Sequence, residues 1–203
     1  MKNANRNSET CSFKSNTMLF PLRLSAQSDE QLMKRAAQGN DRAFEELYNR
    51  HARRLQGFFV RRLGNDADLA ADFMHDTFLR LYAAREKYHE GNSFRAWLYS
   101  IAYNLCKNHH RNQLTIVRDD EKDMPAEADI EIELDESILH DALREVLKNL
   151  PEPYAMLFSL HYEEELTIPQ IAQITEVPEG TVKSRLNKTM NIIKQELKKY
   201  ENR

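Results

Sequence analysis

The sequence predicts an all-α protein built from two small helical domains. Only 5 glycines and 6 prolines occur among the 203 residues, so the chain lacks the frequent turns of a β architecture. Charged residues make up 30% of the chain and hydrophobic residues 41%, and helix formers dominate. Apolar residues recur at helical spacing through most of the chain, which is enough to build a core between packed helices.

The predicted N-terminal domain spans residues 28–112. Residues 1–27 precede it and are expected to be mostly disordered, because they are polar and largely without pattern. The four predicted helices cover about 28–39, 41–63, 66–87 and 93–112. Ser28 and Gln31 form a capping box at the first start, and Ser93 caps the fourth helix. The third helix has its expected core positions at Leu69, Phe73, Phe78, Leu81 and Tyr82.

Residues 113–134 are predicted to form a flexible acidic linker. Between Asp119 and Glu136 there are ten acidic residues against Lys122 alone, so this segment carries −9. The whole chain carries −3, which leaves +6 for the remainder. The net charge therefore conceals a basic protein with an acidic strap, and the distribution of charge matters more than its sum.

The predicted C-terminal domain spans residues 135–203 and ends in a helix-turn-helix. Two helices come first, at about 135–150 and 153–162. Thr167 and Gln170 then form a capping box for a short helix, and Pro178 breaks the helical run because it disfavours helix in the residue before it. The last helix repeats apolar residues at spacings of three and four: Val182, Leu186, Met190, Ile193 and Leu197.

The first turns of that last helix also carry small or basic side chains: Thr181, Lys183, Ser184, Arg185 and Lys188. Such side chains can reach bases and phosphates when a helix enters the major groove of DNA. The alternative is an ordinary surface hairpin of helices whose lysines are only solvated. The pattern favours DNA binding over this alternative.

A second polar face lies opposite the apolar stripe of the fourth predicted helix and contains Asn104, Lys107, Asn108 and Arg111. In or near the preceding loop and the first turns lie Tyr88, His89, Asn92 and Tyr99. Cations follow phosphates, while aromatic rings and amides hold unstacked bases, so this mixture suits a single strand of nucleic acid. Ordinary solvation explains the helix face equally well. Phe94 and Trp97 are predicted to be core residues rather than ligands of a base.

The sequence contains no pattern typical of a metal site, a disulfide scaffold or an enzyme. Cys11 and Cys106 have neither metal-ligand spacing nor the density of a disulfide scaffold, and Cys106 is expected to be a small buried residue. The histidines form no metal-ligand set, and there is no Gly-rich phosphate loop or nucleophile elbow. We therefore predict no metal, no cofactor and no catalytic residues. The lack of a signal peptide or of a long apolar run indicates a soluble cytoplasmic protein.

Three stretches carry a more specific pattern: AADFMHDTFLRLY at 70–82, FRAWLYSIAYNLCKNHHR at 94–111, and LTIPQIAQITEVPEGTVKSRL at 166–186. In this order, with Leu150-Pro151 between the second and the third, they resemble the sigma factors of bacterial RNA polymerase. The short linker is similar to that of the two-domain group called extracytoplasmic-function (ECF) sigma factors. The resemblance covers about residues 28–200. It implies a promoter-specificity subunit that is not an enzyme.

The resemblance also implies a role for each site. Residues that grip the coiled coil of the polymerase clamp would be Asp72, His75, Asp76 and Phe78. Residues that open the −10 promoter element and hold its melted strand would be Asn92, Asn104, Lys107, Asn108 and Arg111. Residues that read the −35 element as duplex would be Thr181, Lys183, Ser184, Arg185 and Lys188. The implied partners are polymerase core, through the beta-prime clamp and the beta flap, promoter DNA, and an anti-sigma factor that is often membrane-anchored.

Four positions depart from the pattern of the family. His75 stands where Gln is common, and Asn108 where Asp is frequent. Glu176 occupies a turn position often held by Gly, so a left-handed backbone there would carry a steric penalty. Pro178 replaces a common capping Ser, which deprives the last helix of a side-chain cap.

A binding protein of another class is the main alternative. A free-standing helix-turn-helix activator would use only the C-terminal domain on DNA, with the N-terminal domain serving as a sensor or dimerisation unit. Such a protein should bind duplex DNA tightly without polymerase.

Overall fold

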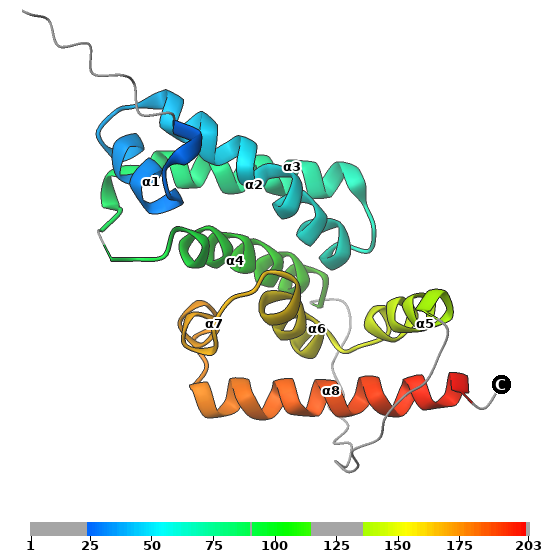
Figure 1. Ribbon diagram of the computed structural model, residues 1–203. Coiled ribbons are helices and arrows are strands. Elements are labelled where there is room, and N and C mark those ends of the chain that lie inside the picture. The colour runs from blue at the N-terminus through cyan, green and yellow to red at the C-terminus, as the bar shows by residue number, and fades with distance from the viewer. Residues whose placement is uncertain (1–23, 90, 115–135, 202–203) are drawn as a thin grey trace, which may run out of the picture.

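The computed structural model describes residues 24–89, 91–114 and 136–201, and the regular structure in these ranges is helical throughout (Figure 1). The α-helices are α1 (Asp29–Ala37), α2 (Asp41–Arg62), α3 (Ala67–Ala83), α4 (Phe94–Leu114), α5 (Glu136–Lys148), α6 (Glu152–Phe158), α7 (Ile168–Thr175) and α8 (Glu179–Glu201). The 3-10 turns η1 (Leu24–Ala26) and η2 (Arg85–Lys87) and the π-helical turn η3 (Ser159–Glu163) complete the set. The predicted all-α class is confirmed.

Side-chain caps start the helices of the N-terminal domain. The capping box of Ser28 and Gln31 is present as predicted. Asp66 caps α3 by accepting from the Leu69 N–H at 2.9 Å, and Ser93 Oγ accepts from the N–H of Ala96 at 3.3 Å in the first turn of α4. The third helix was predicted to run to about 87 but ends at 83, where the chain tightens into η2.

Aromatic rings fill the interior of the N-terminal domain. The largest fully buried side chains there are Phe58, Phe59, Phe94 and Tyr99. Phe58 and Tyr99 meet edge to face with ring centroids 5.4 Å apart, a favoured geometry for aromatic pairs. The predicted stripe along α3 is confirmed in its centre, since Phe78 and Leu81 are buried and the other three positions are half-buried.

The predicted disorder of residues 1–27 does not extend to its last four positions. Residues 24–26 form η1, and the carbonyl oxygens of Leu24 and Gln27 accept hydrogen bonds from Arg50 at 3.1 and 2.8 Å. The guanidinium has five donors in a rigid fork, so one side chain can hold two carbonyls at once. Residues 1–23, with Cys11, and residues 115–135, which include most of the acidic linker predicted over 113–134, lie outside the described residues. The first two positions of that predicted linker belong to α4 instead.

The helix-turn-helix forms as predicted. The N–H of Thr167 donates to Gln170 Oε1 at 2.9 Å within the capping box. Glu176 ends α7 in the left-handed conformation, with φ +59°, so the penalty expected for a side chain at this turn is real. Val182, Leu186, Ile193 and Leu197 are buried along α8, and Met190 is half-buried.

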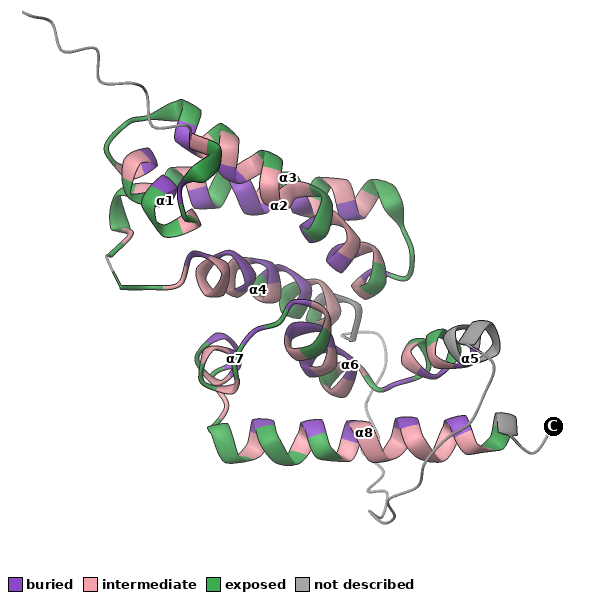
Figure 2. Cartoon of the chain, in the orientation of Figure 1, coloured by how far each residue is buried: buried purple, intermediate pink, exposed green. Residues whose placement is uncertain are grey.

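The two domains pack against each other instead of standing apart. In Figure 1, α4 lies between the helices α1–α3 and the helices α6 and α7, and one cluster of buried apolar residues runs from α1 to the first half of α8. A second cluster joins α5 and α6 to the C-terminal half of α8. Figure 2 shows the buried residues of α8 on the side that faces α6. None of the described helices is long and apolar enough to cross a membrane.

Candidate nucleic-acid interface

The predicted duplex-reading residues lie in the first turns of α8. Thr181, Ser184, Arg185 and Lys188 follow i, i+3, i+4, i+7 spacing and so share one face of the helix, and Lys183 lies beside it. Lys183 and Ser184 are exposed, whereas the other three are half-buried. The Ser184 hydroxyl donates to the Thr181 carbonyl at 3.0 Å, and Lys188 Nζ lies 5.6 Å from the ring centroid of Tyr154. The structure therefore brings all five residues together, on a helix anchored by its opposite side.

The polar face of α4 has the same construction. Asn104, Lys107, Asn108 and Arg111 again follow i, i+3, i+4, i+7 spacing, and all four are exposed. Asn92, the fifth residue predicted for a melted strand, is exposed in the loop before α4. The amides and cations therefore form one continuous polar side of α4, opposite the buried residues of the same helix.

Tyr88 shapes the loop that leads into α4. Its hydroxyl donates to the Asn92 carbonyl at 2.6 Å, and its ring stacks on Trp97 with centroids 5.6 Å apart. Burial, with the charges of Glu30 and Asp29, raises the pKa of Tyr88 to about 12, so the hydroxyl remains a donor at neutral pH. Tyr88 is thus a support of the loop. The prediction that Trp97 is structural agrees with this stack.

Tyr99 was predicted to lie near this loop as part of the aromatic surface for nucleic acid, and that prediction is wrong. The side chain is 1% exposed, and its hydroxyl donates to the carboxylate of Glu164. Burial and the nearby Glu164 raise the pKa of Tyr99 well above its ordinary value. Phe94, predicted to belong to the core, is fully buried.

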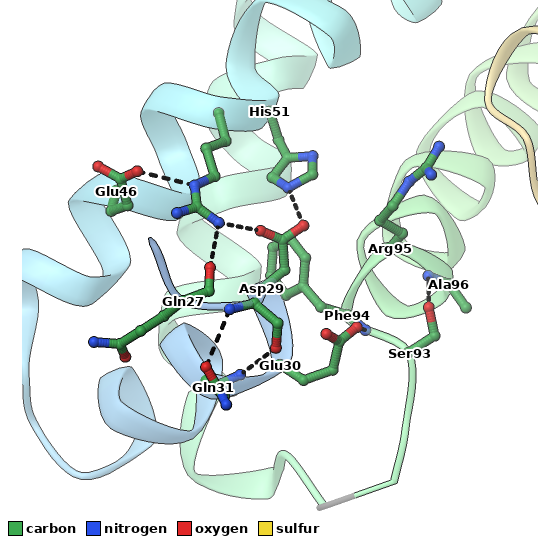
Figure 3. Close-up of polar contacts among 12 residues, drawn as sticks. Gln27, Asp29, Glu30, Gln31, Glu46, His51, Ser93, Phe94, Arg95 and Ala96 are labelled. Carbon is green, nitrogen blue, oxygen red and sulfur yellow. Dashed lines mark hydrogen bonds and ion pairs between the residues drawn. The ribbon is translucent and has the colours of Figure 1, made fainter. Parts of the chain in front are cut away.

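A polar network beneath the loop joins α1 to α2 and to the start of α4 (Figure 3). The carboxylate of Asp29 accepts from Arg50 at 2.9 Å and lies 2.7 Å from His51 Nε2. His51 lowers the pKa of Asp29, with a smaller contribution from Arg50, so the carboxylate stays ionised. The neighbouring Glu30 Oε1 accepts from the Phe94 N–H at 3.4 Å. The network fixes the point where the loop becomes helix, and the sequence patterns gave no indication of it.

The predicted polymerase-binding residues lie on α3, with one correction. Asp72 and His75 are exposed, and Asp76 is half-buried, with Oδ2 2.9 Å from Arg80 Nη2. Phe78 is only 3% exposed and packs against Tyr48 at a centroid distance of 4.8 Å, so it cannot touch a partner.

The exposed apolar side chain on this face is Leu79, which is 69% exposed. Asp72, His75, Asp76 and Leu79 share i, i+3, i+4, i+7 spacing. That spacing in the sequence could have identified Leu79 in place of Phe78.

The described residues include no group of three or more His, Cys, Asp or Glu side chains that could hold a metal ion. Cys106 is fully buried, as predicted for a small core residue. Burial, followed by the nearby Glu152, raises the pKa of its thiol to about 12, which keeps it in the neutral, unreactive form.

Comparison with known proteins identifies the family. Residues 47–114 match the family described as Sigma-70 region 2, and residues 140–191 match Sigma-70, region 4. The chain is 30% identical over 180 residues to the RNA polymerase sigma-H factor of Pseudomonas aeruginosa, a match that covers 80% of this chain and 90% of that protein. The chain belongs to the ECF-type sigma factors of RNA polymerase.

Other relatives of this sigma factor cover most of its length. It is 27% identical to the ECF RNA polymerase sigma-E factor of Haemophilus influenzae, over 84% of this chain and 95% of that one. It is 26% identical to the ECF RNA polymerase sigma factor SigW of Bacillus subtilis, over 82% and 95%. As a sigma factor, the protein is a non-enzymatic subunit that directs transcription initiation by RNA polymerase, and its region 4 binds DNA.

Two solved structures share the fold of this sigma factor. CnrH, in complex with the cytosolic domain of CnrY, gives a TM-score of 0.62 at 21% identity, over 85% of this chain and 98% of that one. RpoE of Bartonella quintana, in complex with the anti-sigma factor NepR, gives a TM-score of 0.58 at 20% identity, over 76% and 96%.

Proposed function

We propose that this sigma factor initiates transcription through three separate faces. The exposed side of α3 docks on the polymerase clamp, the loop before α4 and the polar side of α4 take the melted −10 strand, and the first turns of α8 read the −35 duplex. The observation that supports this division is shared by all three helices. Each has a buried stripe on one side and, on the other, functional side chains at the spacing of a single helix face.

The docking face suits a basic helical partner. Asp72 and Asp76 supply negative charge, His75 a polar ring, and Leu79 an exposed apolar contact. A helix face that combines one apolar anchor with acidic neighbours is complementary to a coiled coil rich in cations. Docking there would hold region 2 on the beta-prime clamp, and region 4 would meet the beta flap.

The −10 surface binds a strand and performs no chemistry. Lys107 and Arg111 neutralise phosphates, and Asn104 and Asn108 offer amides to base edges. Asn92 sits in the loop that Tyr88 and Trp97 support. A base that leaves the stack loses its stacking energy, and a preformed loop offsets that cost because it need not be ordered on binding.

The −35 surface reads duplex DNA in the major groove. Arg185 can bond O6 and N7 of one guanine together, which discriminates by about 1–3 kcal/mol against other bases. Lys183 and Lys188 supply the charge that follows phosphates. Thr181 and Ser184 are short enough to let the helix approach closely.

We also infer an anti-sigma partner, with polymerase, promoter and partner all meeting this protein in the cytoplasm. The support is the likeness to two sigma factors whose solved structures contain the CnrY cytosolic domain and the anti-sigma factor NepR. Co-purification of the tagged full chain from its own cells, followed by mass spectrometry, tests this inference. Recovery of polymerase without a second stoichiometric protein under non-inducing conditions would contradict it.

An electrophoretic shift with and without polymerase core tests the promoter assignments. Its DNA comes from transcripts that appear when the protein is induced, aligned upstream of their starts. Strong specific binding is expected only once core is added. Tight specific binding by the free chain, unchanged by core, would instead identify a free-standing helix-turn-helix activator.

A further inference from the structure

The turn between η3 and α7 carries three consecutive glutamates, Glu163–Glu165, onto the surface of the N-terminal domain. Glu164 is completely buried there. Its Oε2 accepts from Arg54 Nε at 2.8 Å, and its Oε1 accepts from Arg61 Nη2 at 3.0 Å. The Tyr99 hydroxyl is a third donor. One carboxylate of region 4 is therefore enclosed by three side chains of region 2.

The neighbouring groups repeat this pairing. Glu163 Oε2 accepts from Arg61 Nε at 2.9 Å, and the Glu163 carbonyl accepts from Arg54. Arg95 donates to the Glu164 carbonyl, and its Nη1 lies 3.6 Å from the Glu165 carboxylate. Each of these contacts joins region 4 to region 2, with arginines from both α2 and α4.

The backbone of this turn has two uncommon features, a π-helical turn and a left-handed residue. The Glu164 N–H bonds the Ser159 carbonyl at 2.9 Å, the i→i+5 pattern of the π-helical turn η3. Glu165 follows with φ +55°, a left-handed conformation disfavoured for a residue with a β-carbon. Wide turns and left-handed residues of this kind persist where surrounding contacts hold them.

The closed arrangement is incompatible with simultaneous reading of two promoter elements. Elements named −35 and −10 lie about 25 base pairs apart, which is roughly 85 Å at about 3.4 Å per base pair. A compact body of the 156 residues that the structure describes has a radius of gyration of about 15 Å and is roughly 40 Å across. Here α7 packs on α4, and Arg185 is close enough to Tyr103 for its charge to oppose the rise that burial causes in the pKa of Tyr103.

We propose that the acidic turn is a latch that holds regions 2 and 4 in a closed form, and that the latch must open before the promoter is engaged. The proposal rests on the two promoter surfaces assigned above. The contact is suited to switching because a buried carboxylate is stable only with its cations in place. Loss of one partner leaves an uncompensated charge, so partial opening is disfavoured. The chain therefore has two states, closed and open, with few stable intermediates.

Two variants of the full chain test the latch. Glu164→Gln removes the buried charge, and Arg54→Gln combined with Arg61→Gln removes its cations at side chains that are about 40% exposed. Glu196→Gln is the matched control, since it breaks an exposed pair with Lys199 inside α8. Small-angle X-ray scattering reports the radius of gyration, and a shift assay reports binding of the free chain to a −35 duplex.

Both latch variants should expand and bind the −35 duplex more tightly without core, while the control matches the wild type. If the closed form does not bind the duplex and the variant is fully open, the gain in affinity equals the inverse of the open fraction in the wild type, about tenfold to a thousandfold for a minor state populated at roughly 0.1–10%. If Glu164→Gln loses its helical circular dichroism, the Arg54→Gln and Arg61→Gln double variant tests the latch in its place. Unchanged size and affinity in a folded variant would overturn the latch. A different result, loss of promoter-specific transcription by every holoenzyme including the wild type, would refute the promoter assignments instead.

Discussion

Region 2 packs on aromatic rings, whereas the buried residues of the cluster at the far end of region 4 are small or aliphatic. Edge-to-face contacts link Phe58 to Phe59 and to Tyr99, and Phe59 to Phe73. The buried residues of the second cluster are Ala142, Val146, Leu150, Ala155, Ile193 and Leu197. Ring pairs have preferred orientations, so an aromatic core specifies shape more tightly than an aliphatic one. In the proposed function, region 2 has to support a shaped loop, whereas region 4 has to hold one long helix.

The contact between the two regions combines apolar packing with ion pairs. Apolar packing between α4 and α7 is continuous with the main core, but at one edge the contact turns ionic around Glu164. Apolar burial is tolerant of small shifts, whereas a buried carboxylate depends on each donor. Apolar packing thus dominates within each region, whereas the joint between the regions also depends on a buried charge.

The largest effect is expected from the aromatic core. Phe78→Ala should lower the free energy of unfolding by about 3–5 kcal/mol, because it removes a buried ring packed against Tyr48. The adjacent Leu79→Ala should change stability by less than about 0.5 kcal/mol, since its side chain is exposed. Urea denaturation measures both.

The same two variants distinguish the hydrophobic core of region 2 from its proposed docking surface. Leu79→Ala should weaken binding to polymerase core while the fold stays intact. If Leu79→Ala is the more destabilising of the two, the burial of this helix is reversed and the docking face must be reassigned.

Local signals account for what could be predicted from the sequence. Both capping boxes, the buried stripes of α3 and α8, the buried Cys106 and the helix-turn-helix each depend on residues three or four positions apart. The left-handed backbone of Glu176 agrees with the resemblance to the sigma family, in which Gly often holds this turn position. The polar faces of α4 and α8 follow from the same periodicity.

Contacts between distant segments could not be predicted in this way. Arg54 and Glu164 are 110 positions apart, and a run of three glutamates ordinarily indicates a solvated surface. The sequence pattern suggests that Tyr99 binds bases, because the pattern does not show that the side chain is buried beneath that run. Periodicity identifies which side of a helix is buried, but not which charged side chain a neighbouring domain will cover.

The next largest effect is expected from the proposed duplex-reading face of region 4. Arg185→Ala should reduce −35-dependent transcription by roughly fivefold to 150-fold, the equivalent of about 1–3 kcal/mol, because the proposed bidentate contact with guanine would be lost. Lys183→Ala should give a smaller loss that depends on salt and little on sequence. In vitro transcription with matched and altered −35 elements measures both. Lys148→Ala, an exposed lysine of α5, is the control, and loss of core binding by Arg185→Ala would contradict the assignment.

A smaller effect is expected from the proposed docking face of region 2. Asp72→Ala should weaken core binding modestly, since an exposed ion pair contributes about 0.2–1 kcal/mol. Asp76→Ala should have the larger effect, because it also releases Arg80, whose pKa the carboxylate now raises, to repel a basic partner. Titration of labelled core at low and high salt measures both affinities. Glu86→Ala serves as the exposed acidic control, and equal affinities for all three variants would place docking elsewhere.

The smallest expected effect is a pH dependence that arises from a second ionic cluster between the regions. His110 Nε2 of α4 lies 3.3 Å from Glu152 Oε1 of α6, and Arg62 Nη1 of α2 lies 3.7 Å from the other carboxylate oxygen. Cys106 and the ring of His109, 5.9 Å from that of His110, are the other titratable groups at hand. Glu152 raises the pKa of His110 above its ordinary 6.5, while burial and Arg62 oppose the rise.

Protonated His110 therefore stabilises the closed form. This contribution is complete below pH 6.5, and it is lost as the pH rises through the raised pKa, because neutral imidazole no longer pairs with Glu152. The free chain should expand slightly and bind the −35 duplex better as the pH rises from about 6 to 8, a window set by the ordinary histidine pKa. Scattering and shift assays across that range measure the change. His110→Gln should flatten the dependence while leaving the Glu164 latch closed, so a pH dependence that persists in His110→Gln would assign it to another group.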